Sequence, residues 1–297
     1  MTGNDFKGNP TPVFVLDEDQ NWPVERVLQA IAREMNQSET IFVKPAAARS
    51  RGTYDIRSFT PFAEEPFCGH GIVGAAIALE GRCDQGNLTF QTVGGIFVHA
   101  ESLGRAETSS GKRTLGQVMT VKLRIPSVPV TEPLDHDLEL RERMAKAIEI
   151  APLQILALGR NSLMDLVVEV DSTVDFSADT IKIDAGALMK GSPPGTRSQI
   201  ITSQGRRDGV DFLKRVFAYG SEDQATGSTH CVLAPYWGSK LGKSCMKAKQ
   251  VSERTGEAEV ESIVNDGGGH VGLTGSGVLI MEGRILVPRV ARFDTKL

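Results

Sequence analysis

The sequence predicts an α+β protein that consists of two similar halves. Segments with the apolar–polar alternation of short strands outnumber segments with helical spacing along the 297 residues. The order of these segments in the first half occurs again in the second half. Matching residues lie at a nearly constant separation, which is 158 residues for Gly69 and Gly227, 158 for Phe59 and Phe217, and 161 for Gly95 and Gly256. An internal duplication explains this agreement better than chance does.

The first half combines two helices with several strands. A helix is expected over Val24–Met35, because its apolar residues recur at helical spacing on one face. A second, apolar helix, Ile72–Leu79, is opened by Gly69. The segment Glu101–Gly116 is rich in Ser, Thr, Gly and charged residues, which predicts a hairpin loop. The expected strands are Thr11–Leu16, Glu39–Lys44, Tyr54–Thr60, Leu88–Phe90, Ile96–Ala100 and Val118–Ile125.

The second half repeats this order. A helix is expected to begin at Gly227 and reach about Ser239, and it corresponds to the helix after Gly69. The expected strands are Asp165–Val170, Ser198–Thr202, Phe212–Ala218 and Val251–Val260. We therefore predict an N-terminal lobe over residues 1–115 and a C-terminal lobe over residues 116–283. Residues 284–297 are a segment that could return to the N-terminal lobe.

Composition and charge exclude several classes of protein. The 33 Lys and Arg residues against 37 Asp and Glu give a net charge of −4, and the densest basic stretch, Lys240–Lys249, lacks aromatic residues. We therefore expect no nucleic-acid partner. No apolar run approaches the roughly 20 residues of a membrane span, so no membrane partner is expected. The N-terminus has no apolar signal segment, which predicts a cytoplasmic location. The four cysteines show no paired metal spacing, so no metal is expected.

Two loops occupy matching positions in the halves, 64–71 and 221–229. Each is acidic, turns at a glycine and then enters a helix. A glycine lets the backbone approach a ligand closely, and the free N–H groups of a first helical turn bind anions. The same arrangement is also an ordinary way to begin a helix. Because ligand sites favour the cleft between domains, the double occurrence favours a site that holds a carboxylate or an enolate between two helix starts.

The sequence resembles the PhzF-like isomerases over nearly its whole length. The motifs that carry the resemblance are Gly8-Asn-Pro before a Val-Phe-Val strand, Asn36-Gln-Ser-Glu-Thr, Pro66-Phe-Cys-Gly-His, Glu222-Asp-Gln-Ala-Thr-Gly-Ser and Leu233-Ala-Pro-Tyr-Trp, in the family's order. Two positions depart from the family's pattern. Gln224 stands where the family usually has proline, and Gly71 where it often has proline or alanine.

The resemblance implies the diaminopimelate-epimerase-like fold, in which each of two pseudo-symmetric lobes is a curved, barrel-like mixed sheet around a central helix. It further implies a homodimer that needs no cofactor and no metal. The implied partner is a small-molecule carboxylic acid substrate, since the type member of the family isomerises a dihydro-hydroxyanthranilate on the phenazine pathway.

The resemblance also assigns roles to individual residues. Glu39 matches the catalytic glutamate, which removes a proton from one carbon and returns it to another, and burial would suit it by raising its pKa toward about 6–7. His70 and Asp223 match two further catalytic residues. By themselves, the residues have ordinary explanations: a surface glutamate at a strand start, a capping histidine and an acid favoured by a helix dipole. The expected substrate-binding residues are Ser228, Gly69, Gly71, Gly227, Thr229 and Cys68.

Cys68 bears on the type of reaction. Racemases of this fold use two cysteines, one on each face of the carbon, whereas the counterpart of Cys68 at the 158-residue separation is Thr226. A threonine hydroxyl is too weak an acid to replace a thiol, which argues against two-base racemisation. We therefore expect an isomerase that moves a proton within a small unsaturated or cyclic carboxylic acid, with Glu39 as acid and base at the cleft between the lobes. The alternatives are a dehydratase (lyase) or epimerase of the same fold, and an inactive homologue that only binds its ligand.

Overall fold

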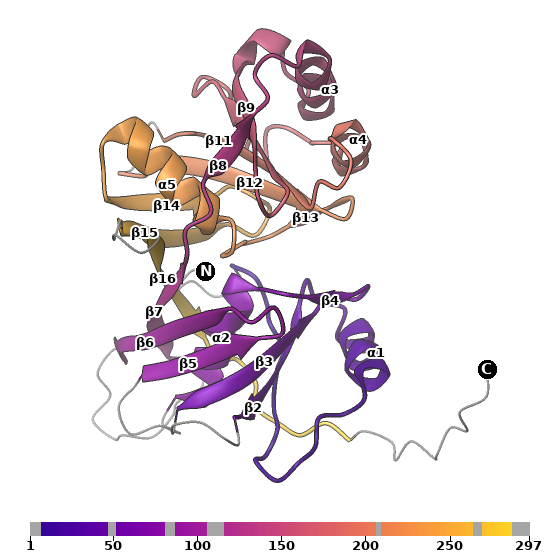
Figure 1. Cartoon of the computed structure of the whole chain (residues 1–297), viewed down its shortest axis with the longest axis vertical. Helices are drawn as coiled ribbons and strands as arrows, with labels where there is room; N and C mark the ends of the chain where they lie inside the picture. The colour runs from indigo at the N-terminus through magenta and orange to yellow at the C-terminus, as the bar shows by residue number, and fades with distance from the viewer. Residues whose placement is uncertain are drawn as a thin grey trace, which may run out of the picture.

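The computed structural model describes residues 7–46, 52–80, 87–105, 116–205, 209–263 and 269–286. Within these residues sixteen strands belong to one sheet, and five α-helices pack against it (Figure 1). None of the helices in these ranges is long and apolar enough to cross a membrane. Strands from the two halves of the sequence gather in two lobes, one above the other in Figure 1.

The sheet in the N-terminal lobe has mixed strand directions. Its strands are β1 (Val13–Val15), β2 (Thr40–Pro45), β3 (Thr53–Phe59), β4 (Glu64–Glu65), β5 (Asn87–Thr92) and β6 (Phe97–Arg105). β1 is parallel to β2, and β2 is antiparallel to β3. β3 also pairs antiparallel with β4 and parallel with β5. β5 in turn pairs antiparallel with β6.

The C-terminal lobe has the same pairing pattern. Its strands are β10 (Asp165–Val170), β11 (Ser198–Gln204), β12 (Phe212–Ala218), β13 (Ser221–Asp223), β14 (Cys245–Gln250) and β15 (Gly256–Ile263). β10 is parallel to β11, β11 is antiparallel to β12, and β12 pairs antiparallel with β13 and parallel with β14. Strand for strand, this is the order of the first lobe. The structure therefore confirms the repeated architecture that the sequence predicts.

Four further strands complete the sheet. β7 (Val118–Pro126) pairs with β6, β16 (His270–Val278) pairs with β15, and β7 and β16 pair antiparallel with each other. The ladder between β7 and β16 joins the two lobes. β8 (Val130–Pro133) and β9 (Ile155–Asn161) extend the edge of the second lobe beyond β10.

One buried helix lies inside each lobe. α2 (Gly69–Leu79) is apolar on every side, which is typical of a helix that is surrounded by protein. It packs against β1, β2, β6, β7 and β16, while α5 (His230–Leu241) packs against β14, β15 and β16. Residues of both helices belong to one continuous apolar core. Because both helices begin at the boundary between the lobes, the core fixes the two helix starts relative to each other.

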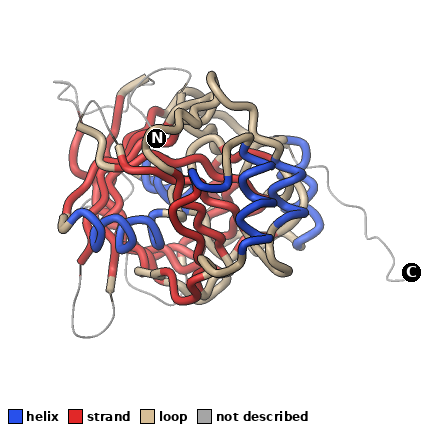
Figure 2. The backbone as a smooth tube through the Cα atoms, turned by 90° about the horizontal axis from the view of Figure 1, so that it is seen from above, coloured by secondary structure: helices blue, strands red, loops and turns tan. Residues whose placement is uncertain are grey.

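The remaining helices cover the outside. α1 (Glu25–Met35) places Leu28 and Ala32 on Phe42 and Phe59 of the first lobe. α3 (Leu138–Ile148) and α4 (Ala185–Gly191) cover the second lobe together with a short 3₁₀ turn, η1 (Pro152–Gln154). Seen from above, these outer helices share one side of the molecule, opposite to α5 (Figure 2).

Several predicted boundaries differ from the structure. The strand predicted at Val251–Val260 begins only at Gly256, because the polar run before it forms a bend. In the segment Glu101–Gly116, β6 continues to Arg105, and residues 106–115 lie outside the described residues. Most of the segment 284–297 also lies outside them. The division at residue 115 stays a prediction.

Candidate active site

Glu39 lies immediately before β2, at the end of the first lobe that faces the second. The strand behind it is buried, and the Glu39 side chain is only 17% exposed. Burial, helped by the negative charges of Asp223 and Glu65, raises the pKa of the Glu39 carboxyl to about 8, against a smaller lowering by a hydrogen bond from Ser38. A carboxyl group in this environment has both protonation states available near neutral pH.

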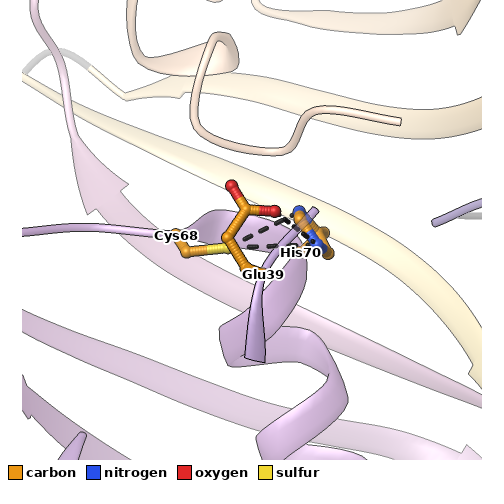
Figure 3. A group of neighbouring side chains, drawn as sticks. All are labelled: Glu39, Cys68 and His70. Atoms are coloured by element: carbon orange, nitrogen blue, oxygen red, sulfur yellow. Dashed lines mark hydrogen bonds and ion pairs between the residues drawn. The ribbon is translucent and has the colours of Figure 1, made fainter. Parts of the chain in front are cut away.

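Cys68 and His70 lie at the start of α2, beside Glu39. Cys68 is the N-cap residue, and its Sγ accepts a hydrogen bond of 3.3 Å from the backbone N–H of Gly71. His70 Nε2 is 3.3 Å from Glu39 Oε2, and His70 Nδ1 is 3.5 Å from Cys68 Sγ (Figure 3). Burial lowers the pKa of the His70 imidazole and raises the pKa of the Cys68 thiol. The three side chains therefore form a compact and largely dry group.

Asp223 enters the site from the second lobe, at the end of β13. One of its carboxylate oxygens accepts a hydrogen bond of 2.6 Å from Asn9 Nδ2, and the other accepts one of 2.6 Å from Thr226 Oγ1. Asn9 Oδ1 in turn accepts a hydrogen bond of 2.8 Å from Ser38 Oγ, next to Glu39. A chain of side-chain hydrogen bonds thus runs from Ser38, the neighbour of Glu39, to Asp223 of the second lobe.

The two helix starts meet through a pair of glycines. A Cβ atom built on Gly69 would lie 2.7 Å from the backbone nitrogen of Ser228, and one built on Gly227 would lie 2.9 Å from the backbone nitrogen of His70. A side chain fits at neither position. The N–H of Gly71 is bonded to Cys68, and those of His230 and Cys231 are bonded to the loop before α5. The N–H groups left at the contact, without a hydrogen-bond partner among the described residues, are those of Gly69, His70, Gly227 and Ser228. This arrangement can bind an anion.

The other predicted substrate-binding residues have different surroundings. Ser228 is half-buried beside Gly69. Thr229 is buried, and its hydroxyl accepts a hydrogen bond of 2.7 Å from Lys214 Nζ. Gly71 is buried, and a Cβ atom there would lie 2.4 Å from the side chain of Ile41. At the position where the family usually has proline, Gln224 Oε1 accepts a hydrogen bond of 3.0 Å from the backbone N–H of Arg254.

Lys214 and His230 form a buried pair behind the second loop that the sequence analysis missed. Lys214 Nζ donates to Thr226 O at 2.5 Å and lies 3.1 Å from His230 Nε2. Burial lowers the pKa of Lys214 to about 7 and that of His230 well below its ordinary value. The signal was present in the sequence, because Lys214 stands among apolar residues on the buried side of β12. Lys214 thereby holds the loop that carries Asp223 and Gly227.

Arg197 is the counterpart of Glu39 in the second lobe, since it follows Glu39 by the same 158 residues that separate the two glycines. Its guanidinium donates two hydrogen bonds, of 2.9 and 2.8 Å, to the carboxylate of buried Asp165. Cys231, the only cysteine near the second helix start among the described residues, is buried in the core. The two lobes therefore present different chemistry: an acid in the first and a paired cation in the second.

One further contact between the lobes lies at the edge of the site. The hydroxyl of Tyr219, in the turn between β12 and β13, donates a hydrogen bond to Glu65 of the first lobe. Tyr219 has a positive φ of 52°, which is uncommon for a residue other than glycine. The contact joins the two acidic loops that lead to the helix starts.

Comparisons with known proteins agree with this architecture. The family model described as "Phenazine biosynthesis-like protein" matches residues 1–283. The chain is 32% identical to mouse phenazine biosynthesis-like domain-containing protein 2 over 96% of both chains. It is 31% identical to an uncharacterized isomerase of Halalkalibacterium halodurans, over 97% of this chain and 96% of that protein.

A crystal structure described as a putative phenazine biosynthesis PhzC/PhzF protein from Clostridium difficile is also similar. It superposes with a TM-score of 0.71 at 31% identity, over 96% of each chain. The likeness thus extends over both lobes. The chain belongs to the phenazine biosynthesis-like (PhzC-PhzF) family.

Proposed function

We propose that the protein is a cofactor-independent isomerase that moves a proton within a small unsaturated or cyclic carboxylic acid. The observation that carries this proposal is the buried Glu39 carboxyl, whose Oε2 lies 3.3 Å from His70 Nε2 and whose pKa is raised by burial and by the charge of Asp223 in the other lobe. The name of the Halalkalibacterium relative, an isomerase, supports the same class of reaction. The substrate carboxylate binds at the paired helix starts, where backbone N–H groups converge.

The reaction then needs one proton carrier. Glu39 in its carboxylate form removes a proton from one carbon of the bound acid, and the electron pair left behind is delocalised over the conjugated system toward the substrate's carboxylate. The N–H groups near Gly69 and Gly227 stabilise the charge that develops there. The protonated Glu39 returns the proton to another carbon, so the product is an isomer and the enzyme is restored. Because burial raises the pKa of Glu39 to about 8, both half-reactions are accessible near neutral pH.

His70 and Asp223 support this step in different ways. His70 Nε2 lies close enough to Glu39 to orient the carboxyl or to donate to the substrate. Asp223 has both oxygens occupied by Asn9 and Thr226, so its role is to position the site and to raise the pKa of Glu39 by its charge. The presence of Arg197 at the position equivalent to Glu39 supports a single proton carrier over a symmetrical pair.

Deuterium incorporation during turnover tests the proposal. The protein is incubated in D₂O with a panel of unsaturated and cyclic carboxylic acids, and the products are analysed by NMR and mass spectrometry. A buried single base predicts an isomerised product with partial internal return of the original hydrogen. Glu39→Gln should lower the rate by at least about 10²–10⁴-fold, whereas Glu139→Gln, at a side chain that is 90% exposed on α3, should not change it.

The same experiment separates the alternatives. Complete solvent exchange with inversion at one carbon would indicate an epimerase, and loss of water would indicate a dehydratase. Binding of acids without any turnover would indicate an inactive homologue. Unchanged turnover in Glu39→Gln would contradict the assignment of Glu39.

A further inference from the structure

Glu39, Cys68 and His70 offer three metal-ligand atoms at one point. A carboxylate oxygen, the thiol sulfur and an imidazole nitrogen all lie within 4.8 Å of one another. His70 Nε2 is 3.3 Å from Glu39 Oε2 and 4.0 Å from Cys68 Sγ. Figure 3 shows the three side chains converging from the strand start and the first turn of α2.

Two of these separations can be compared directly with the edges of a zinc coordination tetrahedron. With Zn–N and Zn–O distances of about 2.0–2.1 Å and a Zn–S distance of about 2.3 Å, nitrogen and oxygen ligands stand about 3.3 Å apart and nitrogen and sulfur about 3.6 Å apart. The Nε2–Oε2 separation of 3.3 Å already has the required length. The Nε2–Sγ separation of 4.0 Å is longer than required, so Cys68 Sγ moves toward the other two ligand atoms when zinc binds. Sulfur, nitrogen and oxygen together are a ligand set typical of zinc.

The ligand atoms have few competing partners. Among the described residues, Glu39 Oε2 is buried and has no hydrogen-bond partner. Cys68 lies at the N-cap of an 11-residue helix, where its sulfur accepts a hydrogen bond from the N–H of Gly71. A metal ion must displace the thiol proton when it binds there. The catalytic proposal also gives the thiol no task. Asp223 cannot serve as the fourth ligand without breaking its bonds to Asn9 and Thr226, so the fourth position is left to solvent or to a bound carboxylate.

We propose that Glu39, Cys68 and His70 form an inhibitory zinc site. Formation of the Zn–S bond releases the thiol proton, and the Glu39 carboxyl also gives up its proton to bind as a carboxylate. Both protons pass to solvent, and no oxidation state changes. Zinc in this position occupies the proton carrier and blocks turnover. Only this inhibition rests on the proposed function, because the binding of zinc itself is measured without substrate.

Cobalt substitution gives a direct readout of the site. The metal-free protein is titrated with Co²⁺ alone and then with Zn²⁺ alone. One equivalent of Co²⁺ should produce a near-ultraviolet sulfur-to-metal charge-transfer band together with the visible bands of a tetrahedral ion, and Zn²⁺ should displace it. Cys68→Ser should abolish the charge-transfer band. Glu39→Gln should keep the band but weaken zinc binding by at least about 10–100-fold, the loss caused even by removing an outer partner of a metal ligand.

Cys245→Ser is the matched control, because Cys245 is the exposed free thiol of the described residues. It should retain the band, the stoichiometry and the affinity. A charge-transfer band that survives in Cys68→Ser, or that disappears in Cys245→Ser, would overturn the proposal. Failure of the wild-type protein to bind one equivalent of metal tightly would also overturn it. Circular dichroism confirms that each variant is folded.

The two proposals fail independently. Zinc binding that depends on Cys68, in a protein with no turnover of any acid, would support the metal site and contradict the isomerase. Turnover that depends on Glu39, with no zinc bound and no inhibition by micromolar zinc, would support the isomerase and contradict the metal site.

Discussion

Lys214 is a lysine in the interior of the second lobe, where charged groups are rarely found without partners. Its ammonium group donates to the carbonyl oxygen of Thr226 and the hydroxyl of Thr229 and contacts His230. These contacts tie Lys214 to the second loop and to the start of α5. Burial lowers the pKa of Lys214 to about 7, so the charged form carries a desolvation cost.

This cost predicts a pH-dependent stability. An unfolded lysine titrates near 10.4, so between about pH 7 and pH 10 the unfolded chain binds a proton that the folded protein does not, and the free energy of unfolding should rise with pH. Between about pH 7 and pH 10 this rise in the free energy of unfolding amounts to several kcal/mol, and Lys214→Met should remove it. Urea unfolding from pH 6 to pH 10 measures it, with the exposed Lys190→Met as control. Parallel stability curves for Lys214→Met and the wild type would contradict the explanation.

Residues of the candidate site differ in how well the sequence indicates them. Glu39, His70 and Asp223 stand in motifs that the family shares, and the structure brings Glu39 and His70 to 3.3 Å. Asn9 contributes through a contact with Asp223, which is distant in the chain and which no local pattern reports. The burial of Lys214 is indicated by its apolar neighbours in β12, but its contacts with Thr226 and Thr229 become visible only in three dimensions.

At the scale of elements, the starts of α2 and α5 depend on the absence of two side chains. Gly69 and Gly227 let the two backbones approach so closely that a Cβ atom on either would lie within 3 Å of the other loop. Contacts this short involve backbone atoms, which cannot rotate away. The approach sets the distance between the Glu39 and Asp223 sides of the site.

Gly69→Ala should therefore lower both stability and activity. The added methyl group meets the Ser228 nitrogen at 2.7 Å and forces the lobes apart, at a cost of about 1–3 kcal/mol as for overpacked cores. Gly74→Ala, in the middle of the same helix, meets Thr11 only at 3.5 Å and should be neutral or stabilise by about 0.5–1 kcal/mol. Thermal unfolding and the turnover rate compare the two variants. Equal effects of both substitutions would refute the close-contact argument.

Elements with a strong local pattern could be predicted from the sequence, and others could not. The wholly apolar stretch of α2 was predicted within a few residues, and β12 was predicted with the bounds that the structure gives it. The start of β15 was placed five residues early, because the polar residues before Gly256 form a bend that periodicity does not distinguish from a strand. The extra strands β8 and β9 have no counterpart among the described residues of the first half, so the duplication gave no guide to them.

For the whole molecule, the repeated order of strands explains why one site receives matching loops from two lobes. β7 and β16 join the sheets, and the apolar core continues through both central helices. The repeat is exact in topology but not in chemistry, because Arg197 in its pair with Asp165 stands where the first lobe has Glu39. A site with one titrating acid follows from this asymmetry. The homodimer implied by the family resemblance stays a prediction.

The central claim is that the second lobe helps to keep the Glu39 carboxyl protonated near neutral pH. Carbon-13 NMR of protein labelled at the glutamate carboxyl carbons, with the signal assigned by its absence in Glu39→Gln, measures this pKa directly. The account predicts titration at about pH 8 in the wild type and a lower pKa in Asp223→Asn, which removes the negative charge across the cleft. Titration of Glu39 near its ordinary pKa of about 4.3, unchanged in Asp223→Asn, would contradict it.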